Sequence, residues 1–153
     1  MAKKIVIVGA LGYLGTELCK LYSGESWFHN IIALDSRFVS KRVNQLKDWN
    51  IKFYQGQILD ENFLQKHLKD ADVVHHLAGI TNVPRTEREA SAELDSKIKL
   101  VGISGTQNIL DSINKNCKII FPSTHIVFEG IDKIQKDIDE SEMTKPLLSY
   151  SSS

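Results

Sequence analysis

Short apolar runs alternate with longer amphipathic segments along the whole chain. The first run, residues 5–8, is rich in β-branched residues, with a polar start before it and Gly9 after it. The runs cover residues 5–8, 31–34, 51–54, 73–77 and 119–121. Continuous apolar runs of this length are typical of strands that are buried on both faces of a parallel sheet. We therefore predict a β-strand at each run.

The segments between these runs place their apolar residues three or four positions apart, which is the spacing of one helical face. We predict helices over residues 14–22, 39–49, 60–68 and 86–114, with Asp60 as the N-cap of the third. Gly102 and Gly105 lower the helix propensity of the last segment, and we expect them to let that helix approach the sheet closely. The alternation of strands and helices predicts one doubly wound α/β domain, because crossovers of this length form right-handed parallel units.

Three glycines, Gly9, Gly12 and Gly15, follow the first predicted strand and lead into the first helix. In a dinucleotide-binding turn such glycines permit the tight turn, leave room for a pyrophosphate at the helix N-terminus and let the helix pack on the strand. Asp35 ends the second strand, 20 residues after Gly15. A carboxylate there favours the ribose hydroxyls of NAD over the 2′-phosphate of NADP, and Arg37 is expected to weaken that preference. The pattern predicts a Rossmann-like parallel sheet with strand order 3-2-1-4-5; the alternative is that the glycines serve only the turn and its packing.

Charge and hydropathy exclude several classes of partner. Lys plus Arg (19) balance Asp plus Glu (19), so we expect no whole-chain attraction to nucleic acid or to an anionic membrane. No apolar run approaches the roughly 20 residues of a membrane span, and the apolar start is too short for the core of a signal peptide. We therefore expect a cytoplasmic protein.

Metal binding is not expected from the cysteines or histidines. Cys19 and Cys117 lie far apart without the spacing of a metal site, and in a reducing compartment they are expected to be free, buried thiols. His75 and His76 are adjacent in a predicted strand, so they point to opposite faces and cannot both bind one ion. We expect one of them to be packed and the other to make a polar contact.

Beyond these local patterns, the spacing G-x-x-G-x-x-G resembles that of the extended short-chain dehydrogenase/reductase family, which includes NAD-dependent epimerases and dehydratases of nucleotide sugars. Residues 54–60 resemble the family segment that contacts adenine, with Gln57 in place of the usual acid. Residues 73–79 resemble the V-x-H-L-A-G/A segment that lies along the cofactor, and residues 105–110 resemble the G-T-x-x-L-L helix.

The resemblance and the glycine turn together imply an NAD site at the carboxyl ends of the strands. The residues expected to bind NAD are Gly9, Leu11, Gly12, Tyr13, Leu14, Gly15, Asp35, Ser36, Arg37, Gln57, Ile58, Leu77, Ala78, Gly79 and Thr81.

Two later segments resemble the catalytic motifs of the same family. Residues 123–130 resemble S-[ST]-x-x-V-Y-G, with Phe128 in place of the Tyr and Glu129 as an added residue. Residues 146–153 resemble P-x-S-x-Y-x-x-S-K up to the position before the Lys. The resemblance implies that Tyr150 takes a proton from a substrate hydroxyl while a hydride passes to NAD, and that Thr124 hydrogen-bonds the reacting oxygen. The alternative for Tyr150 is an aromatic side chain that only packs on the sheet.

The type of reaction is less closely defined. His125 and Ile126 stand where sugar 4,6-dehydratases of this family carry an Asp-Glu pair, which favours an epimerase or a reductase. The implied substrate is a nucleotide sugar or a related hydroxyl compound.

The family's catalytic Lys would follow Ser153. We therefore expect residues 1–153 to be an incomplete NAD-binding Rossmann domain, truncated before the last strands and without the C-terminal substrate-binding region. A tyrosine, with a reference pKa of about 10, needs such a cation to act as a base, and general acid–base catalysis is typically worth about 10²–10⁴-fold. Two alternatives to the N-terminal part of an enzyme are a non-catalytic NAD-binding regulator or remnant, and a structural domain without a ligand. Apolar surface left open where strands are missing would favour a homodimer.

Overall fold

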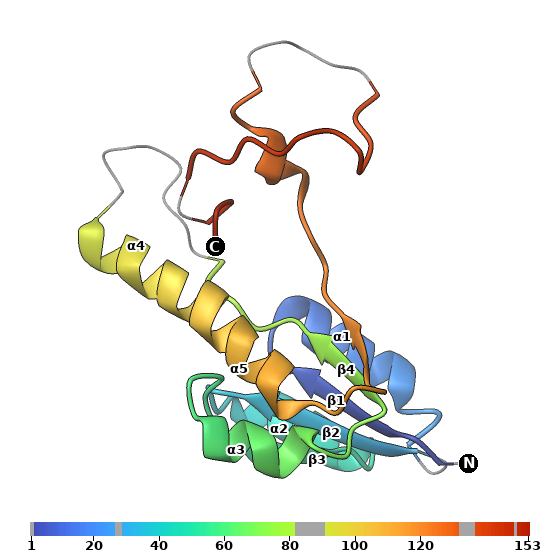
Figure 1. The fold of residues 1–153 in the computed structure, drawn as a ribbon. Helices are drawn as coiled ribbons and strands as arrows, with labels where there is room; N and C mark the ends of the chain where they lie inside the picture. The colour runs from blue at the N-terminus through green and yellow to red at the C-terminus, as the bar shows by residue number, and fades with distance from the viewer. Residues whose placement is uncertain (1, 27–28, 82–90, 132–136, 149) are drawn as a thin grey trace.

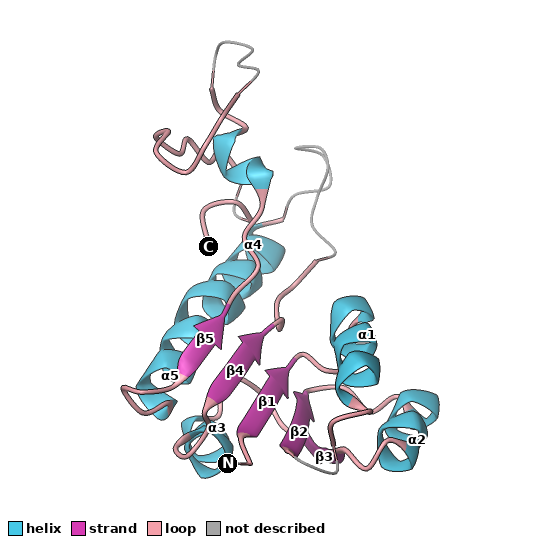
Figure 2. Ribbon diagram, turned by 90° about the vertical axis from the view of Figure 1, so that its right-hand side faces the viewer, coloured by secondary structure: helices cyan, strands magenta, loops and turns pink. Residues whose placement is uncertain are grey.

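The computed structural model describes residues 2–26, 29–81, 91–131, 137–148 and 150–153. Its centre is a five-stranded parallel sheet in the order β3-β2-β1-β4-β5 (Figure 2), which confirms the predicted Rossmann-like order. The strands are β1 (Lys4–Val8), β2 (Asn30–Asp35), β3 (Lys52–Gln55), β4 (Val73–His76) and β5 (Lys118–Ile120).

Helices cover both faces of the sheet, with α1 and α2 on one face and α3 and α5 on the other (Figures 1 and 2). They are α1 (Tyr13–Tyr22), α2 (Ser40–Asp48), α3 (Glu61–Leu68), α4 (Ala92–Lys99) and α5 (Gly105–Ser112). Asp60 is the N-cap of α3, as predicted, and its carboxylate accepts a hydrogen bond from the backbone N–H of Phe63 at 3.0 Å. None of the described helices is both long and apolar enough to cross a membrane.

Of the helix predicted over residues 86–114, the described part begins at Ala92, after the N-cap Ser91, ends at Ser112, and is not uniform. Residues 86–90 lie outside the described part of the chain. The rest consists of α4, a π-helical segment η1 (Leu100–Ser104) and α5. Gly105 packs against Ile58, and a Cβ at Gly105 would lie 2.3 Å from Cδ1 of Ile58. The close approach at Gly105 is therefore to the turn after β3, and Gly102 faces Ser153, so the expected approach of these glycines to the sheet itself is wrong.

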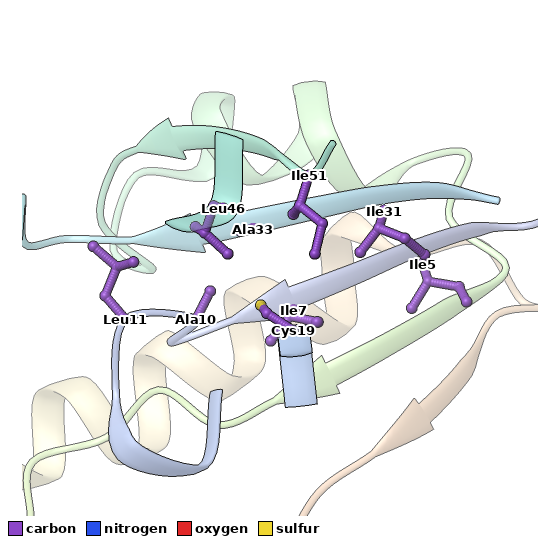
Figure 3. Packing of buried hydrophobic residues seen from close by; sticks show 9 residues of the cluster. All are labelled: Ile5, Ile7, Ala10, Leu11, Cys19, Ile31, Ala33, Leu46 and Ile51. Carbon is purple, nitrogen blue, oxygen red and sulfur yellow. The ribbon is translucent and has the colours of Figure 1, made fainter. Parts of the chain in front are cut away.

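The core lies in two layers because successive residues of each central strand point to opposite faces. Ile5 and Ile7 pack toward α1 and α2 (Figure 3), whereas Val6 and Val8 pack toward α3 and α5. Strands β1, β2 and β4 are buried on both faces over nearly their whole length. The predicted burial of these three strands is confirmed.

The two edge strands differ from the prediction. Strands β3 and β5 begin one residue away from the predicted runs, and most of their residues are exposed or half-buried. The expectation of burial on both faces is wrong here, because each edge strand has a sheet neighbour on one side only and the helices do not cover it fully. An apolar run reports strand propensity, but it does not report the position of the strand in the sheet.

The chain after β5 rises from the carboxyl edge of the sheet (Figure 1). It contains a 3₁₀-helix, η2 (His125–Phe128). Two backbone hydrogen bonds hold its returning part in place, from Lys145 N to Val127 O at 2.8 Å and from Gly130 N to Lys145 O at 2.9 Å. The residues that resemble the two catalytic motifs therefore lie side by side above the ends of the strands.

Candidate functional site

A cavity of about 800 Å³, here called the larger cavity, lies at the carboxyl ends of β1, β2 and β4. Its volume is within the range of pockets that hold small molecules and cofactors, about 300–1,000 Å³. All of the expected NAD-binding residues except Leu11 line it. These residues are Gly9, Gly12, Tyr13, Leu14, Gly15, Asp35, Ser36, Arg37, Gln57, Ile58, Leu77, Ala78, Gly79 and Thr81.

The turn between β1 and α1 forms one wall of this cavity. Gly9 has a φ of +87°, and a Cβ there would lie 2.7 Å from the backbone of Leu77 and Ala78. A Cβ at Gly15 would lie 2.3 Å from the carbonyl oxygen of Gly9. Gly12 differs, because its nearest neighbour is the Gly9 carbonyl oxygen at 3.2 Å and it lines the cavity. The turn therefore leaves open, at the N-terminus of α1, the space that a pyrophosphate needs.

Leu11 does not line the cavity, contrary to its expected place there. The turn directs its side chain into the core below α1 and α2, where it is fully buried. Its backbone N–H nevertheless donates a hydrogen bond to Oδ2 of Asp35 at 2.8 Å. Leu11 thus contributes a backbone group that holds Asp35 in position.

Asp35 is covered by Arg37. Oδ1 of Asp35 accepts hydrogen bonds from the backbone N and the Nε of Arg37, at 2.9 and 3.1 Å. Oδ2 accepts a third from Nη2 of Arg37, at 3.3 Å. The Asp35 side chain is 4% exposed and the Arg37 side chain 58% exposed. The side-chain hydrogen bond to Asp35 raises the pKa of Arg37, and the two side chains form a salt bridge.

Two cations that were not predicted from the sequence, Arg42 and Lys97, also line the larger cavity. Arg42 lies on α2, and its Nη1 donates a hydrogen bond to the carbonyl oxygen of Leu11. Lys97 lies on α4, one helical turn before Val101, which also lines the cavity. Lys97 and Val101 are four positions apart in the segment predicted to be helical, so this spacing was a signal that places them on one helical face. The charged residues among the described lining are thus three cations and one carboxylate.

A second cavity of about 310 Å³, here called the smaller cavity, adjoins the first. The two share Leu14 and residues 77–81. Thr124 and Tyr150, the two expected catalytic residues, both line the smaller cavity. The structure therefore brings them together, next to the segment that follows β4.

Glu129 connects the two segments that carry these residues. Its Oε1 accepts hydrogen bonds from the backbone N–H groups of Leu147 and Leu148, at 2.8 and 2.7 Å, and from the hydroxyl of Ser151. These bonds hold the pKa of Glu129 below its usual range, the bond from Ser151 contributing most. The residue that is added relative to the family pattern thus fixes the turn next to Tyr150.

The adjacent histidines of β4 point to opposite faces, as predicted. Nε2 of His75 lies 3.0 Å from the Tyr22 hydroxyl on the α1 side, and Nε2 of His76 lies 2.9 Å from Oγ1 of Thr106 on the α5 side. The expectation that only one of them makes a polar contact is wrong, because each strand face carries a hydroxyl within reach. Burial lowers the pKa of His76 to about 4, and its Nδ1 has no hydrogen-bond partner among the described residues.

Both cysteines are free, as predicted. Cys19 is buried in the core, which raises its pKa to about 12. Cys117 is only half-buried, because it lies just before the edge strand β5. Within the described ranges, no three His, Cys, Asp or Glu side chains are grouped as metal ligands.

The sequence as a whole was compared with protein families. The model described as "3-beta hydroxysteroid dehydrogenase/isomerase family" matches residues 6–151. The chain belongs to that family.

Relatives of this 3-beta hydroxysteroid dehydrogenase/isomerase family member are enzymes named for nucleotide sugars. It is 29% identical over 159 residues to dTDP-D-glucose 4,6-dehydratase of Dictyostelium discoideum, and the alignment covers 95% of the chain and 36% of that relative. It is 31% identical over 142 residues to UDP-N-acetyl-alpha-D-glucosaminuronate decarboxylase of Bacillus cytotoxicus, which covers 91% of the chain and 42% of that relative. The chain thus spans less than half the length of these relatives and matches their N-terminal part.

Solved structures show the same fold as this family member. UDP-glucose 4-epimerase from Brucella ovis, in complex with NAD, superposes with a TM-score of 0.77 at 24% identity, over 99% of the chain and 44% of that structure. DesIV, a dTDP-glucose 4,6-dehydratase from Streptomyces venezuelae with NAD and TYD bound, gives 0.78 at 22% identity, over 97% and 47%. The family match and the relatives confirm the resemblance to the NAD-dependent epimerases and dehydratases.

Proposed function

We propose that the chain binds NAD in the larger cavity and forms the cofactor-binding part of an epimerase/dehydratase-type oxidoreductase that acts on a nucleotide sugar. The observation that carries the proposal is the cavity itself. It is lined by the glycine turn, by Asp35 at the end of β2 and by the segment after β4. In an open parallel sheet, this position beyond the carboxyl ends of the strands is where ligands bind.

The residues of the larger cavity fit the parts of a dinucleotide. The space at Gly12 would hold the pyrophosphate, and Asp35 would bind the adenosine ribose. Gln57 and Ile58 would contact the adenine. Residues 77–81 line both cavities, so a dinucleotide along them would reach Thr124 and Tyr150. When bound there, NAD would supply the acceptor for a hydride.

Thr124 and Tyr150 are the proposed catalytic residues. Both have a hydroxyl group, and both line the smaller cavity. In the proposed roles Tyr150 holds or moves the proton of a substrate hydroxyl, and Thr124 donates a hydrogen bond to the reacting oxygen. General acid–base catalysis requires such groups within hydrogen-bond reach of the reacting atom.

Domain extent, compartment and assembly belong to the same proposal. Residues 1–153 would form the NAD-binding Rossmann domain. The two free thiols support a cytoplasmic location, because thiols stay reduced in that compartment. Leu100, Ile103 and Leu110 are exposed on η1 and α5, and such apolar side chains support a homodimer.

The proposal is tested by calorimetric titration of the folded chain with NAD. We expect saturable binding with one NAD per chain. The variant Gly12→Ala should weaken binding by about tenfold or more, because its methyl group takes space at the pyrophosphate amides. The φ of Gly12, −72°, is one that alanine adopts, and the added Cβ would lie 3.2 Å from the Gly9 carbonyl oxygen, which has to shift by only a few tenths of an ångström.

Gly24→Ala is the matched control, because a Cβ at Gly24 has no neighbour within 4 Å and lies outside the lining of both cavities. It should bind NAD as the unaltered chain does. Absence of NAD binding by a chain that melts cooperatively would overturn the proposed function.

A further inference from the structure

The carboxylate of Asp35 is already fully engaged within the protein. Each of its oxygens accepts two hydrogen bonds, Oδ1 from Arg37 N and Nε, and Oδ2 from Leu11 N and Arg37 Nη2. Its side chain is 4% exposed. A ribose that hydrogen-bonds to Asp35 must therefore displace a donor that is already there.

The donor that can leave is the Arg37 guanidinium. The backbone N–H groups of Leu11 and Arg37 are fixed by the turn after β1 and by the end of β2. The Arg37 side chain, by contrast, is 58% exposed and can move into solvent. When a binding-competent state is only partly populated, the apparent affinity falls by the populated fraction. Arg37 thus competes with NAD for Asp35.

A displaced guanidinium stays at the mouth of the larger cavity. Arg37 and Ser36 both line that cavity, and Gly12 lies close by, since a Cβ built there would be 3.9 Å from Nη2 of Arg37. A guanidinium binds phosphate through two parallel hydrogen bonds. With Arg42 and Lys97, it leaves the lining with more positive than negative charge. If Asp35 were free, its carboxylate would repel a 2′-phosphate at this end of the cavity. The same end therefore also contains the Arg37 guanidinium, which binds a phosphate.

We propose that Arg37 is a latch on Asp35 that sets cofactor selectivity: it lowers the affinity for NAD and gives the 2′-phosphate of NADP a partner, so that the chain binds both dinucleotides. This inference rests on the proposed function, because it concerns the same cavity. It differs from a simple preference for NAD, because removal of Arg37 should raise the affinity for NAD and lower the affinity for NADP.

The test is calorimetric titration of the chain with NAD and with NADP, before and after Arg37→Met. Met keeps the apolar stem but removes the charge and the hydrogen bonds. The unaltered chain should bind NADP within about tenfold of NAD. In R37M the affinity for NAD should rise by about three- to tenfold, and the affinity for NADP should fall by about tenfold or more. Lys41→Met, an exposed position on α2 outside the lining, is the control for loss of one charge.

A second comparison shows whether Arg37 acts through Asp35. In an Asp35→Asn background there is no ion pair to release, so adding R37M should no longer improve NAD binding. An unchanged or weaker NAD affinity in R37M, or the same gain in the D35N background, would overturn the latch. Failure of the unaltered chain to bind NADP would overturn the phosphate role.

The proposed function fails separately from the latch. If the unaltered chain binds NAD and R37M leaves the affinity for NAD unchanged, the latch is wrong and the proposed function stands. If no folded variant binds either dinucleotide, the proposed function and the latch are both wrong.

Discussion

Gly9 and Gly12 lie in one turn but meet different surroundings. At Gly9 the positive φ and the neighbouring backbone of Leu77 leave no place for a side chain. At Gly12 the φ is ordinary and the space toward the cavity is open. We therefore predict that a substitution at Gly9 acts on folding and that one at Gly12 acts on the proposed binding of NAD.

Gly9→Ala should destabilise the fold. The methyl group would lie 2.7 Å from backbone atoms of the segment after β4, and an L-residue at this φ is itself strained, at a cost of about 1–3 kcal/mol. Thermal unfolding should show a lower Tm, by roughly 2–4 °C for each kcal/mol in a chain of this size. Gly24→Ala should shift it little, and equal melting of both variants would contradict the role given to Gly9.

Single residues show how far the sequence predicts the site. Fourteen of the fifteen residues expected to bind NAD line the larger cavity, whereas their binding of NAD stays a prediction. Leu11 does not line it, because the turn directs its side chain into the core, and a motif does not encode that direction. Arg42 and Lys97 were missed because they reach the cavity from helices, and only the packing of α2 and α4 on the sheet brings them there.

At the level of the elements, sequence patterns predicted type better than environment. All five strands and the four helical regions exist, because hydrophobic period and glycine signals are local. The exposure of β3 and β5 depends on sheet order, and the π-helical segment η1 depends on how α4 and α5 pack. Neither property is contained in one segment of sequence.

The placement of Leu147, Leu148 and Ser151 is predicted to depend on Glu129. Glu129→Ala removes the acceptor of the Leu147 and Leu148 amides and of the Ser151 hydroxyl. Hydrogen exchange of these two amides should then become about tenfold faster or more, because the turn opens locally. Mass spectrometry of the peptides that contain residues 145–151 measures this.

Glu142→Ala is the control, since Glu142 is an exposed residue of the same part of the chain. The pKa of Glu129 is lowered by its hydrogen bonds, so the protection of the two amides should persist at neutral pH and be lost in acid, as the carboxylate takes up a proton. Unchanged exchange in E129A would show that other contacts hold the turn.

For the whole molecule, the family match covers nearly all of the chain, whereas the relatives extend well beyond it. The fold, the larger cavity and the position of Thr124 and Tyr150 lie in the matched part. The remaining part of the relatives has no counterpart in residues 1–153. The choice between epimerase, reductase and dehydratase, for which His125 and Ile126 favour the first two, stays a prediction.

The stability of the whole molecule should depend on pH through His76, which ends β4 and contacts Thr106 of α5. Burial holds its pKa at about 4, below the ordinary 6.5. The unfolded chain therefore binds a proton between these values that the folded chain does not. The free energy of unfolding should fall as the pH decreases from about 6.5 to about 4, by at most about 3 kcal/mol from this group.

His76→Gln isolates this contribution. Its amide can still hydrogen-bond to Thr106, but it does not titrate. His67 and His75, whose pKa values burial also lowers, remain in both proteins. Urea unfolding at a series of pH values should give a shallower loss of stability in H76Q, and equal slopes would exclude His76 as a source.

The two cavities also differ in where their residues lie along the chain. The larger cavity is lined by residues from Val8 to Val101, whereas the smaller one needs Phe121 to Thr124 and Tyr150. Because a ribosome joins amino acids from the N-terminus onward, every residue lining the larger cavity has been added before the first residue of β5. The order of synthesis therefore separates the two cavities in time, with the residues of the larger cavity made first.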